Sequence, residues 1–134
     1  MALVVDASVV VAALVDNGAT GRWAEQQLQS GPLFAPHLLP VEVANILRKA
    51  GRAGQLSEDH ATLAHQDLTR LQIELAPYEP FADRVWELRQ TITAYDAWYV
   101  ALAEALSVPL ATADLRLARS ATARCAFQTP SEDR

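Results

Sequence analysis

Residues 95–117 read YDAWYVALAEALSVPLATADLRL, and the fold of the chain is organised around this stretch. Its first half carries apolar side chains at helical spacing, namely Tyr99, Leu102, Ala103 and Leu106. That spacing predicts a helix with one apolar face. Pro109 cannot continue the helix, and the short apolar segment 110–112 after it predicts a buried strand. The stretch therefore places Asp96 near the start of a helix and Asp114 at the exit of a strand.

Outward from this stretch, short apolar strands alternate with helices along the chain. The predicted strands cover residues 2–5, 33–35, 73–76, 110–112 and 126–129. The predicted helices cover residues 8–15, 19–29, 40–50, 81–91, 95–106 and 116–124, with one more that begins at the Ser57 cap and buries Leu63, Leu68 and Leu71. This alternation predicts an α/β fold with three α/β/α layers around a mainly parallel sheet of four to five strands, the last of them at an edge.

The bulk composition is that of a globular domain. The 134 residues are 51% apolar and 20% charged, which excludes a disordered chain and favours a single domain over residues 1–134. The single cysteine, Cys125, excludes an intramolecular disulfide and a structural zinc site built on several cysteines. No apolar run approaches the roughly 18 residues of a membrane span, and no basic leader precedes the first strand. We therefore expect a soluble, cytoplasmic protein.

Four acidic residues are predicted to meet at one end of the sheet. Asp6 directly follows the first predicted strand, and Glu42 lies in the first turn of the predicted helix 40–50. They join Asp96 and Asp114, because strand exits and helix starts share one end of a right-handed parallel sheet, where ligands also bind. Each acid alone is also explained as a helix cap or a first-turn acid. Capping does not require the side chains to converge, so we expect one shared cleft.

Four convergent carboxylates require bound protons or a counter-ion. Two carboxylates about 4 Å apart repel each other by ~4 kcal/mol at an effective dielectric constant of about 20. Oxygen ligands without cysteine or a nearby histidine suit Mg²⁺, or alternatively Mn²⁺, rather than zinc. Such a cation activates water for in-line attack on phosphorus. The pattern therefore indicates phosphodiester hydrolysis.

Four segments together carry a family resemblance: VVDAS at residues 4–8, EVANIL at 42–47, YDAWYVALA at 95–103 and PLATAD at 109–114. In this order and spacing they resemble a PIN-domain ribonuclease, and more narrowly the VapC toxins of toxin–antitoxin pairs. The resemblance covers the chain nearly end to end. It implies a PIN-like fold and a Mg²⁺-dependent endoribonuclease that cuts structured RNA such as tRNA or rRNA. It also implies a homodimer and a cognate VapB-type antitoxin whose C-terminal segment blocks the cleft.

The resemblance also assigns roles by position. The acids that would coordinate the metal and carry the catalysis are Asp6, Glu42, Asp96 and Asp114. The polar residues expected to support them in the same cleft are Ser8, Asn45 and Thr112. Arg116 is the best candidate for binding RNA, because it follows Asp114 near a helix N-terminus, where backbone N–H groups also bind phosphate. The net charge of −5 gives no global sign of nucleic-acid binding, so we expect such contacts to be local.

Rival classes fit the sequence less well. A phosphatase of the haloacid-dehalogenase type has a second acid two residues after the first, where this chain has Ser8. A response-regulator receiver needs a late lysine, but the single lysine is Lys49, and no glycine-rich phosphate loop is present. The alternative that stays open is a non-catalytic PIN-type module that only binds a partner protein. Apolar helix residues that would line either the core or such an interface are Val9, Val10, Leu14, Trp23 and Leu63.

Overall fold

The computed structural model describes residues 1–131, and its centre is a five-stranded sheet in which every pairing is parallel. The strands are β1 Leu3–Val5, β2 Leu33–Pro36, β3 Glu74–Ala76, β4 Leu110–Ala111 and β5 Phe127–Gln128. Their order across the sheet is β3-β2-β1-β4-β5. Val4 lies opposite Phe34 on one side and Leu110 on the other, so the first strand of the chain is the central one. The predicted parallel sheet is confirmed, and β5 is at an edge.

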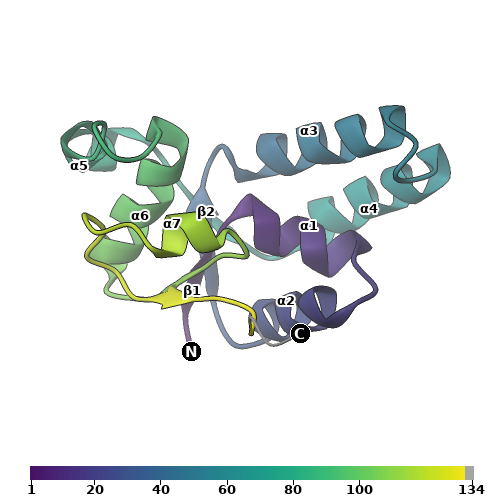
Figure 1. Cartoon of the computed structure of the whole chain (residues 1–134), viewed down its shortest axis with the longest axis horizontal. Helices are drawn as coiled ribbons and strands as arrows, with labels where there is room; N and C mark the ends of the chain where they lie inside the picture. The colour runs from purple at the N-terminus through teal and green to yellow at the C-terminus, as the bar shows by residue number, and fades with distance from the viewer. Residues whose placement is uncertain (132–134) are drawn as a thin grey trace.

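Helices cover both faces of this sheet. They are α1 Ala7–Val15, α2 Ala19–Leu28, α3 Leu39–Arg52, α4 Glu58–Arg70, α5 Ala82–Glu87, α6 Ala94–Leu106 and α7 Leu115–Ala118, with a 3-10 turn, η1, at Glu79–Phe81. Figure 1 shows α1 to α4 on one side of the sheet and α5 and α6 on the other, which is the predicted three-layer arrangement. Within residues 1–131, no helix has both the length and the apolar character needed to cross a membrane.

The core is deepest around β1 and α6. Leu3, Val4 and Val5 have no exposed surface, as expected of a central parallel strand with a helical layer on each face. Residues 97 and 99–103 of α6 are buried, and this helix packs against β1, β2 and β4. The tight packing fixes the start of α6, which carries Asp96, relative to the strand ends that precede Asp6 and Asp114.

The predicted helix over residues 81–91 is shorter in the structure. It consists of η1 and α5, and it ends at Glu87. Beyond α5 the amide of Arg89 donates to the Trp86 carbonyl and that of Thr91 to the Leu88 carbonyl, each three residues back. This tighter spacing closes a helix, and the Thr91 hydroxyl also donates to the Leu88 carbonyl. Residues 88–93 therefore form a loop, called the 88–93 loop below.

The predicted helix over residues 116–124 is reduced to α7, which ends at Ala118. Residues 119–126, called the 119–126 segment below, leave the helix because tertiary partners bind their backbone. Arg84 of α5 donates to the Thr122 carbonyl at 3.0 Å. The Arg124 amide donates to Glu104 of α6 at 2.7 Å. Amphipathic spacing alone was therefore a misleading signal in this region.

Burial corrects the expectations for individual apolar residues. Val9 and Val10 belong to the core, with no exposed surface. Leu63 is 57% exposed, because the buried stripe of α4 runs through Ala64 and Leu68 instead. Leu106 is 40% exposed at the end of α6. The predicted burial of Leu63 and Leu106 was therefore wrong.

Candidate active site

Asp6 follows β1, and its buried carboxylate accepts hydrogen bonds from three donors. It caps the N-terminus of α1 by accepting from the Val9 amide at 3.2 Å. The Ser8 hydroxyl donates to Oδ1 at 2.5 Å, and the Thr112 hydroxyl donates to Oδ2. Burial raises the pKa of Asp6 to about 6; the hydrogen bonds oppose this shift, and the charge of Asp96 adds to it. The hydrogen bonds fix the orientation of the carboxylate, but its buried negative charge is energetically unfavourable without a cation nearby.

The same two hydroxyls join the chain after β1 to the chain after β4. The Ser8 hydroxyl accepts from the Ala113 amide at 2.9 Å. The Thr112 hydroxyl accepts from the Asp114 amide at 3.0 Å, and Thr112 has no exposed surface. Because both hydroxyls also donate to Asp6, they fix the position of Asp114 relative to Asp6.

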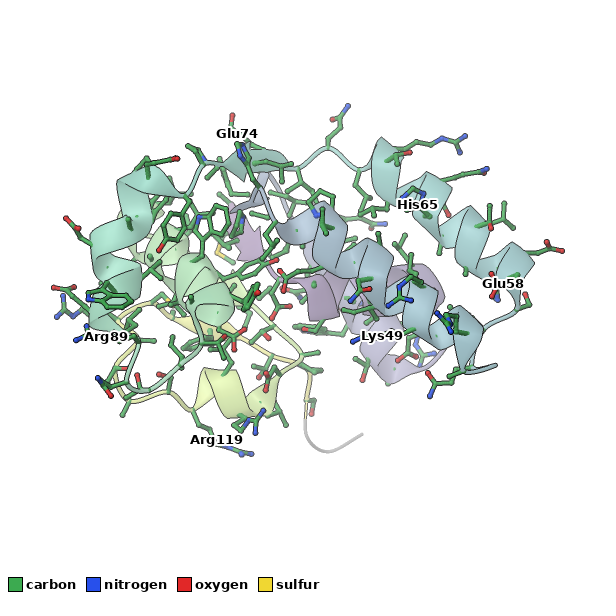
Figure 2. All side chains as sticks on the ribbon, turned by 90° about the horizontal axis from the view of Figure 1, so that it is seen from above. Lys49, Glu58, His65, Glu74, Arg89 and Arg119 are labelled. Carbon is green, nitrogen blue, oxygen red and sulfur yellow. The ribbon has the colours of Figure 1, made fainter. Side chains whose placement is uncertain are left out.

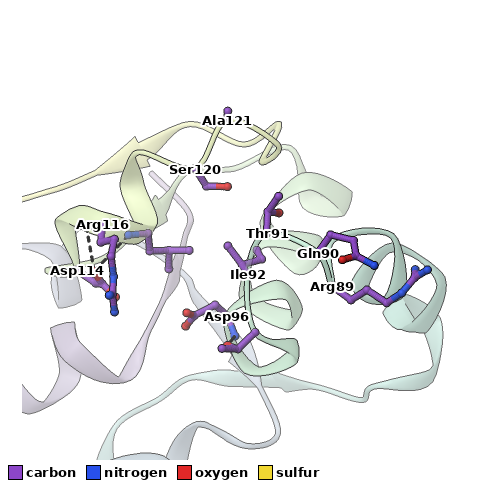
Figure 3. A pocket seen from close by; sticks show the side chains of 11 residues that line it. Arg89, Gln90, Thr91, Ile92, Asp96, Asp114, Arg116, Ser120 and Ala121 are labelled. Carbon is purple, nitrogen blue, oxygen red and sulfur yellow. Dashed lines mark hydrogen bonds between the residues drawn. The ribbon is translucent and has the colours of Figure 1, made fainter.

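Asp114 caps α7 and lies beside Arg116. Its Oδ1 accepts from the amides of Arg116 at 3.0 Å and Leu117 at 3.2 Å. The Arg116 side chain is exposed and extends next to Asp114 (Figure 3). Its positive charge opposes the rise in the pKa of Asp96, so the guanidinium is within electrostatic reach of that acid as well.

Asp96 is the acid that links the other three. It lies in the first turn of α6, where its amide donates to the Thr93 hydroxyl at 3.1 Å. Burial raises the pKa of Asp96, the charge of Asp114 raises it further, and hydrogen bonding from Thr93 opposes the shift. The charge of Asp96 in turn raises the pKa of both Asp6 and Glu42. The four acids thus interact through Asp96 at one end of the sheet.

Glu42 lies in the first turn of α3 and is held by a buried tyrosine. The Tyr99 hydroxyl donates to Glu42 Oε1 at 2.6 Å. Burial raises the pKa of Glu42, the Tyr99 hydrogen bond opposes the shift, and the charge of Asp96 adds to it. Burial and the neighbouring Glu42 also raise the pKa of Tyr99, so its hydroxyl remains a donor. Sequence reasoning placed Tyr99 in an apolar stripe; a phenol three residues after Asp96 on one helical face was the available signal.

Asn45 lies apart from these contacts. It is exposed on α3, and its Oδ1 accepts from Arg48 Nε at 3.0 Å. Among the hydrogen bonds of residues 1–131, none joins Asn45 to the four acids. By contrast, Ser8 and Thr112 both contact Asp6 directly.

A cavity of about 600 Å³ opens over Asp96 and Asp114. Away from these acids it is lined by the 88–93 loop, α7 and the 119–126 segment (Figure 3). Asp6 and Glu42 are not part of its lining. The cavity therefore extends well beyond the space that the acids themselves border.

The donor set suits a hard divalent cation. The side chains at this end of the sheet offer carboxylate and hydroxyl oxygens, and neither histidine nor cysteine lines the cavity. Within residues 1–131, no three carboxylate, imidazole or thiol side chains lie close enough together to hold a metal ion as they stand. The chemistry of the residues fits Mg²⁺ or Mn²⁺, but the side chains would have to rotate to gather around such an ion.

A sequence model of the PIN domain matches residues 3–122. The chain belongs to the PIN-domain family. Within that family it is similar to the VapC ribonuclease Mb0985 of Mycobacterium bovis, with 41% identity over 123 residues that cover 92% of this chain and 94% of the relative. It is also 42% identical to ribonuclease VapC1 of Mycobacterium tuberculosis, over 91% of this chain and 92% of the relative. These relatives confirm the resemblance to VapC ribonucleases.

Solved structures show the same fold at lower identity. PAE2754 from Pyrobaculum aerophilum superposes with a TM-score of 0.71 at 22% identity, covering 95% of this chain and 83% of that one. VapBC2 from Rickettsia felis, solved with a promoter DNA fragment, superposes with a TM-score of 0.66 at 13% identity, covering 98% of this chain and 100% of that one. At these identities the likeness establishes the fold alone.

Proposed function

We propose that this protein is a Mg²⁺-dependent endoribonuclease that acts as the toxin of a toxin–antitoxin pair and hydrolyses structured RNA such as tRNA or rRNA. The observation that supports the proposal is the arrangement of the acids: Ser8 and Thr112 join Asp6 to the chain at Asp114, and Asp96 and Asp114 line one cavity. Glu42 lies near enough for the charge of Asp96 to raise its pKa. The similarity to VapC ribonucleases supports the same reaction.

The residues of this site suggest which side chain would perform each part of the reaction. Asp6 and Asp96 would be the principal ligands of Mg²⁺ or Mn²⁺, and Asp114 would complete the set. Such a cation would activate water and neutralise charge on the phosphate. Glu42, oriented by Tyr99, would position the attacking water and accept its proton. Arg116 would bind a phosphate oxygen beside Asp114.

An antitoxin and a second copy of the chain are the partners we propose. The support is that structural relatives include the VapBC2 complex from Rickettsia felis and a toxin–antitoxin complex from Klebsiella pneumoniae. The surface also exposes large apolar side chains that a partner would cover, including Val41 at 65% and Leu63 at 57% exposure. A VapB-type antitoxin segment over the acids would explain how the producing cell survives.

RNA cleavage by the purified protein tests the reaction. With a structured RNA and Mg²⁺ we expect internal cuts, no cuts in EDTA, and a loss of at least a hundredfold for Asp6→Asn. The matched control is Asp67→Asn, because Asp67 is exposed and forms a surface ion pair with Arg70 at 3.9 Å. Cleavage that survives both EDTA and Asp6→Asn contradicts the metal mechanism. No cleavage of any RNA favours the non-catalytic binding module.

Expression in cells tests the toxin assignment. Wild-type protein should arrest growth, Asp6→Asn should not, and co-expression of the neighbouring upstream gene should relieve the arrest. Harmless expression of a soluble wild-type protein argues against a toxin.

A further inference from the structure

The helix α3 carries a local excess of positive charge. Its three cations are Arg48, Lys49 and Arg52, and the side chains of all three are exposed. The stretch from residue 43 to residue 57 contains no aspartate or glutamate, so it has a charge of +3 in a chain whose net charge is −5. A local surplus of this kind attracts a polyanion even when the protein as a whole is acidic.

The cations follow Glu42 along one side of α3. Lys49 comes seven residues after Glu42, which brings it to the same side of the helix about 10 Å further along the axis, and Arg52 lies about 15 Å along. The opposite side is buried through Val43 and Leu47. Figure 1 shows α3 running away from the sheet toward its turn with α4. A strand that leaves the acids along α3 therefore meets the cations in succession.

These charges are not neutralised by neighbouring acids. Among the ion pairs of residues 1–131, none involves Arg48, Lys49 or Arg52. The acid of α4 that reaches α3 is Glu58, whose Oε1 would lie 2.8 Å from a Cβ atom at Gly51. Figure 2 shows Lys49 on α3 and Glu58 on this neighbouring helix. The cations are thus available to a ligand.

Arg48 is held in place for such a ligand. Its Nε donates to Asn45 Oδ1 at 3.0 Å, and the two terminal nitrogens of its guanidinium remain for an oxyanion. A guanidinium fork matches the oxygens of a phosphate group. Asn45, which lies apart from the four acids, therefore has a role in orienting this arginine.

The position of the cations favours RNA over an acidic protein segment. Both would supply negative charge, but the RNA is the ligand that must pass Glu42 if the acids act on its backbone. A stacked strand presents one phosphate about every 3.4 Å along its axis. The 10–15 Å from Glu42 to the cations therefore corresponds to roughly three to four phosphates.

We propose that Arg48, Lys49 and Arg52 bind the RNA backbone on one side of the cut, roughly three to four phosphates from the scissile one. Contacts of this type fix the position of the strand without reading its bases. The inference rests on the proposed ribonuclease function. It adds that an efficient substrate extends beyond the cut on the side of α3.

The test compares two RNA substrates, using the full chain with Mg²⁺. One is a hairpin that wild type cuts, and the other is a tetranucleotide that spans the same cut and is too short to reach Lys49. Lys49→Gln should raise KM for the hairpin about fivefold at low salt. It should also reduce the slope of log kcat/KM against log salt concentration by about 1. The kcat of the hairpin and the KM of the tetranucleotide should stay unchanged.

Two further variants extend this comparison. The triple variant Arg48→Gln, Lys49→Gln, Arg52→Gln should reduce the salt slope for the hairpin by about 2 to 3, with a wild-type melting temperature because all three side chains are exposed. Arg70→Gln is the matched control. It removes one exposed positive charge from α4, where Asp67 offsets that charge, and should leave KM and the salt slope unchanged.

Wild-type KM and salt slope for the hairpin in the triple variant overturn the backbone-binding assignment while leaving the ribonuclease standing. An equal rise in KM for the tetranucleotide also overturns it, because the cations would then act on the site itself. Unchanged RNA kinetics together with weaker binding of a polyglutamate peptide would assign this face to an acidic protein instead. Absence of any cleavage by wild type overturns the ribonuclease proposal and this inference with it.

Discussion

The Tyr99 hydroxyl reaches Glu42 from inside the core, 2.6 Å from Oε1, although the tyrosine itself is only 2% exposed. A phenol buried to this degree is normally hydrogen bonded, and its partner here is one of the four acids. The bond joins α6 to α3 at the site. It therefore orients Glu42 for the proton transfer proposed above.

Tyr99→Phe removes this donor and keeps the ring. We expect RNA cleavage to fall about tenfold in kcat, because Glu42 loses the hydrogen bond that orients it, with a loss of stability of roughly 1 kcal/mol. Tyr95→Phe is the control, since Tyr95 lies on the same helix and is 61% exposed. In a Glu42→Gln background the substitution should have little further effect on kcat; full additivity of the two losses would contradict the positioning role.

Asp6 should make the stability of the metal-free protein depend on pH. Its pKa is about 6 in the folded protein, above the ordinary 3.8, so the folded state holds the proton more tightly. The stabilisation is fully present below about pH 4 and is lost as pH rises through 6, a change of roughly 2–3 kcal/mol. In EDTA, the melting temperature of Asp6→Asn minus that of wild type should increase from pH 4 to 6 and then level off. A difference in melting temperature that is flat with pH would show that Asp6 does not titrate this way.

For individual residues, the sequence predicts where the four acids lie but not every side chain that hydrogen bonds to them. The acids follow from order along the chain, because parallel strands fix which side chains reach one end of the sheet. Glu42 and Tyr99 are 57 residues apart, and their contact depends on how α3 packs against α6. The spacing of apolar residues predicts that Tyr99 is buried, but it does not predict which residue accepts the hydrogen bond from the Tyr99 hydroxyl.

Among the elements, α5, α6 and the 119–126 segment are joined by one ion pair. The side chains of Arg84 and Glu104 are only 20% and 14% exposed. They form a bidentate ion pair, in which Arg84 Nε and Nη2 donate to the two carboxylate oxygens of Glu104. Burial alone would raise the pKa of Glu104, but the hydrogen bonds and charges of Arg84 and Arg124 outweigh it and lower the pKa. Arg84 and Glu104 also bind the backbone of Thr122 and Arg124, so this pair holds residues 119–124 in place although they form no helix.

Arg84→Ala should lower the melting temperature by several degrees, because Glu104 keeps a partly buried charge without its main partner. Arg70→Ala is the matched control and should change little, since Arg70 and Asp67 are 76% and 61% exposed and 3.9 Å apart. Circular dichroism melts of the two variants measure the difference. Equal melting temperatures for the two would mean that the Arg84 contact contributes no more than a surface pair.

The elements themselves were predicted unevenly, for a physical reason. The strands and the long helices follow from local periodicity and from breakers such as Pro109, which act within a few residues. The ends of α5 and α7 depend on hydrogen bonds to residues far away in sequence, such as Glu104. The local spacing of apolar residues carries no information on those distant partners. The predicted ends of both helices therefore lie too late in the chain.

For the whole molecule, the four acids make folding and cation binding interdependent. In the folded state the charge of Asp96 raises the pKa of Asp6 and Glu42, and the charge of Asp114 raises the pKa of Asp96, so a dication that binds these acids would favour the folded state. Millimolar Mg²⁺ should raise the melting temperature by a few degrees. Asp96→Asn should stabilise the metal-free protein and abolish most of the Mg²⁺ response, because Asp96 links the other three. Asp83→Asn, at an exposed site on α5, should leave both values unchanged; an unaltered Mg²⁺ response in Asp96→Asn would contradict a shared site.

The central place of β1 also bears on when the site forms during folding. Its neighbour β4 follows more than 100 positions later in the chain. Parallel pairing over so long a separation forms late and slowly. Until β4 joins β1, Asp114 and the hydroxyl of Thr112 are not in place beside Asp6, so the four acids come together only late in folding. Under the function proposed above, a partly folded chain would not yet cut RNA.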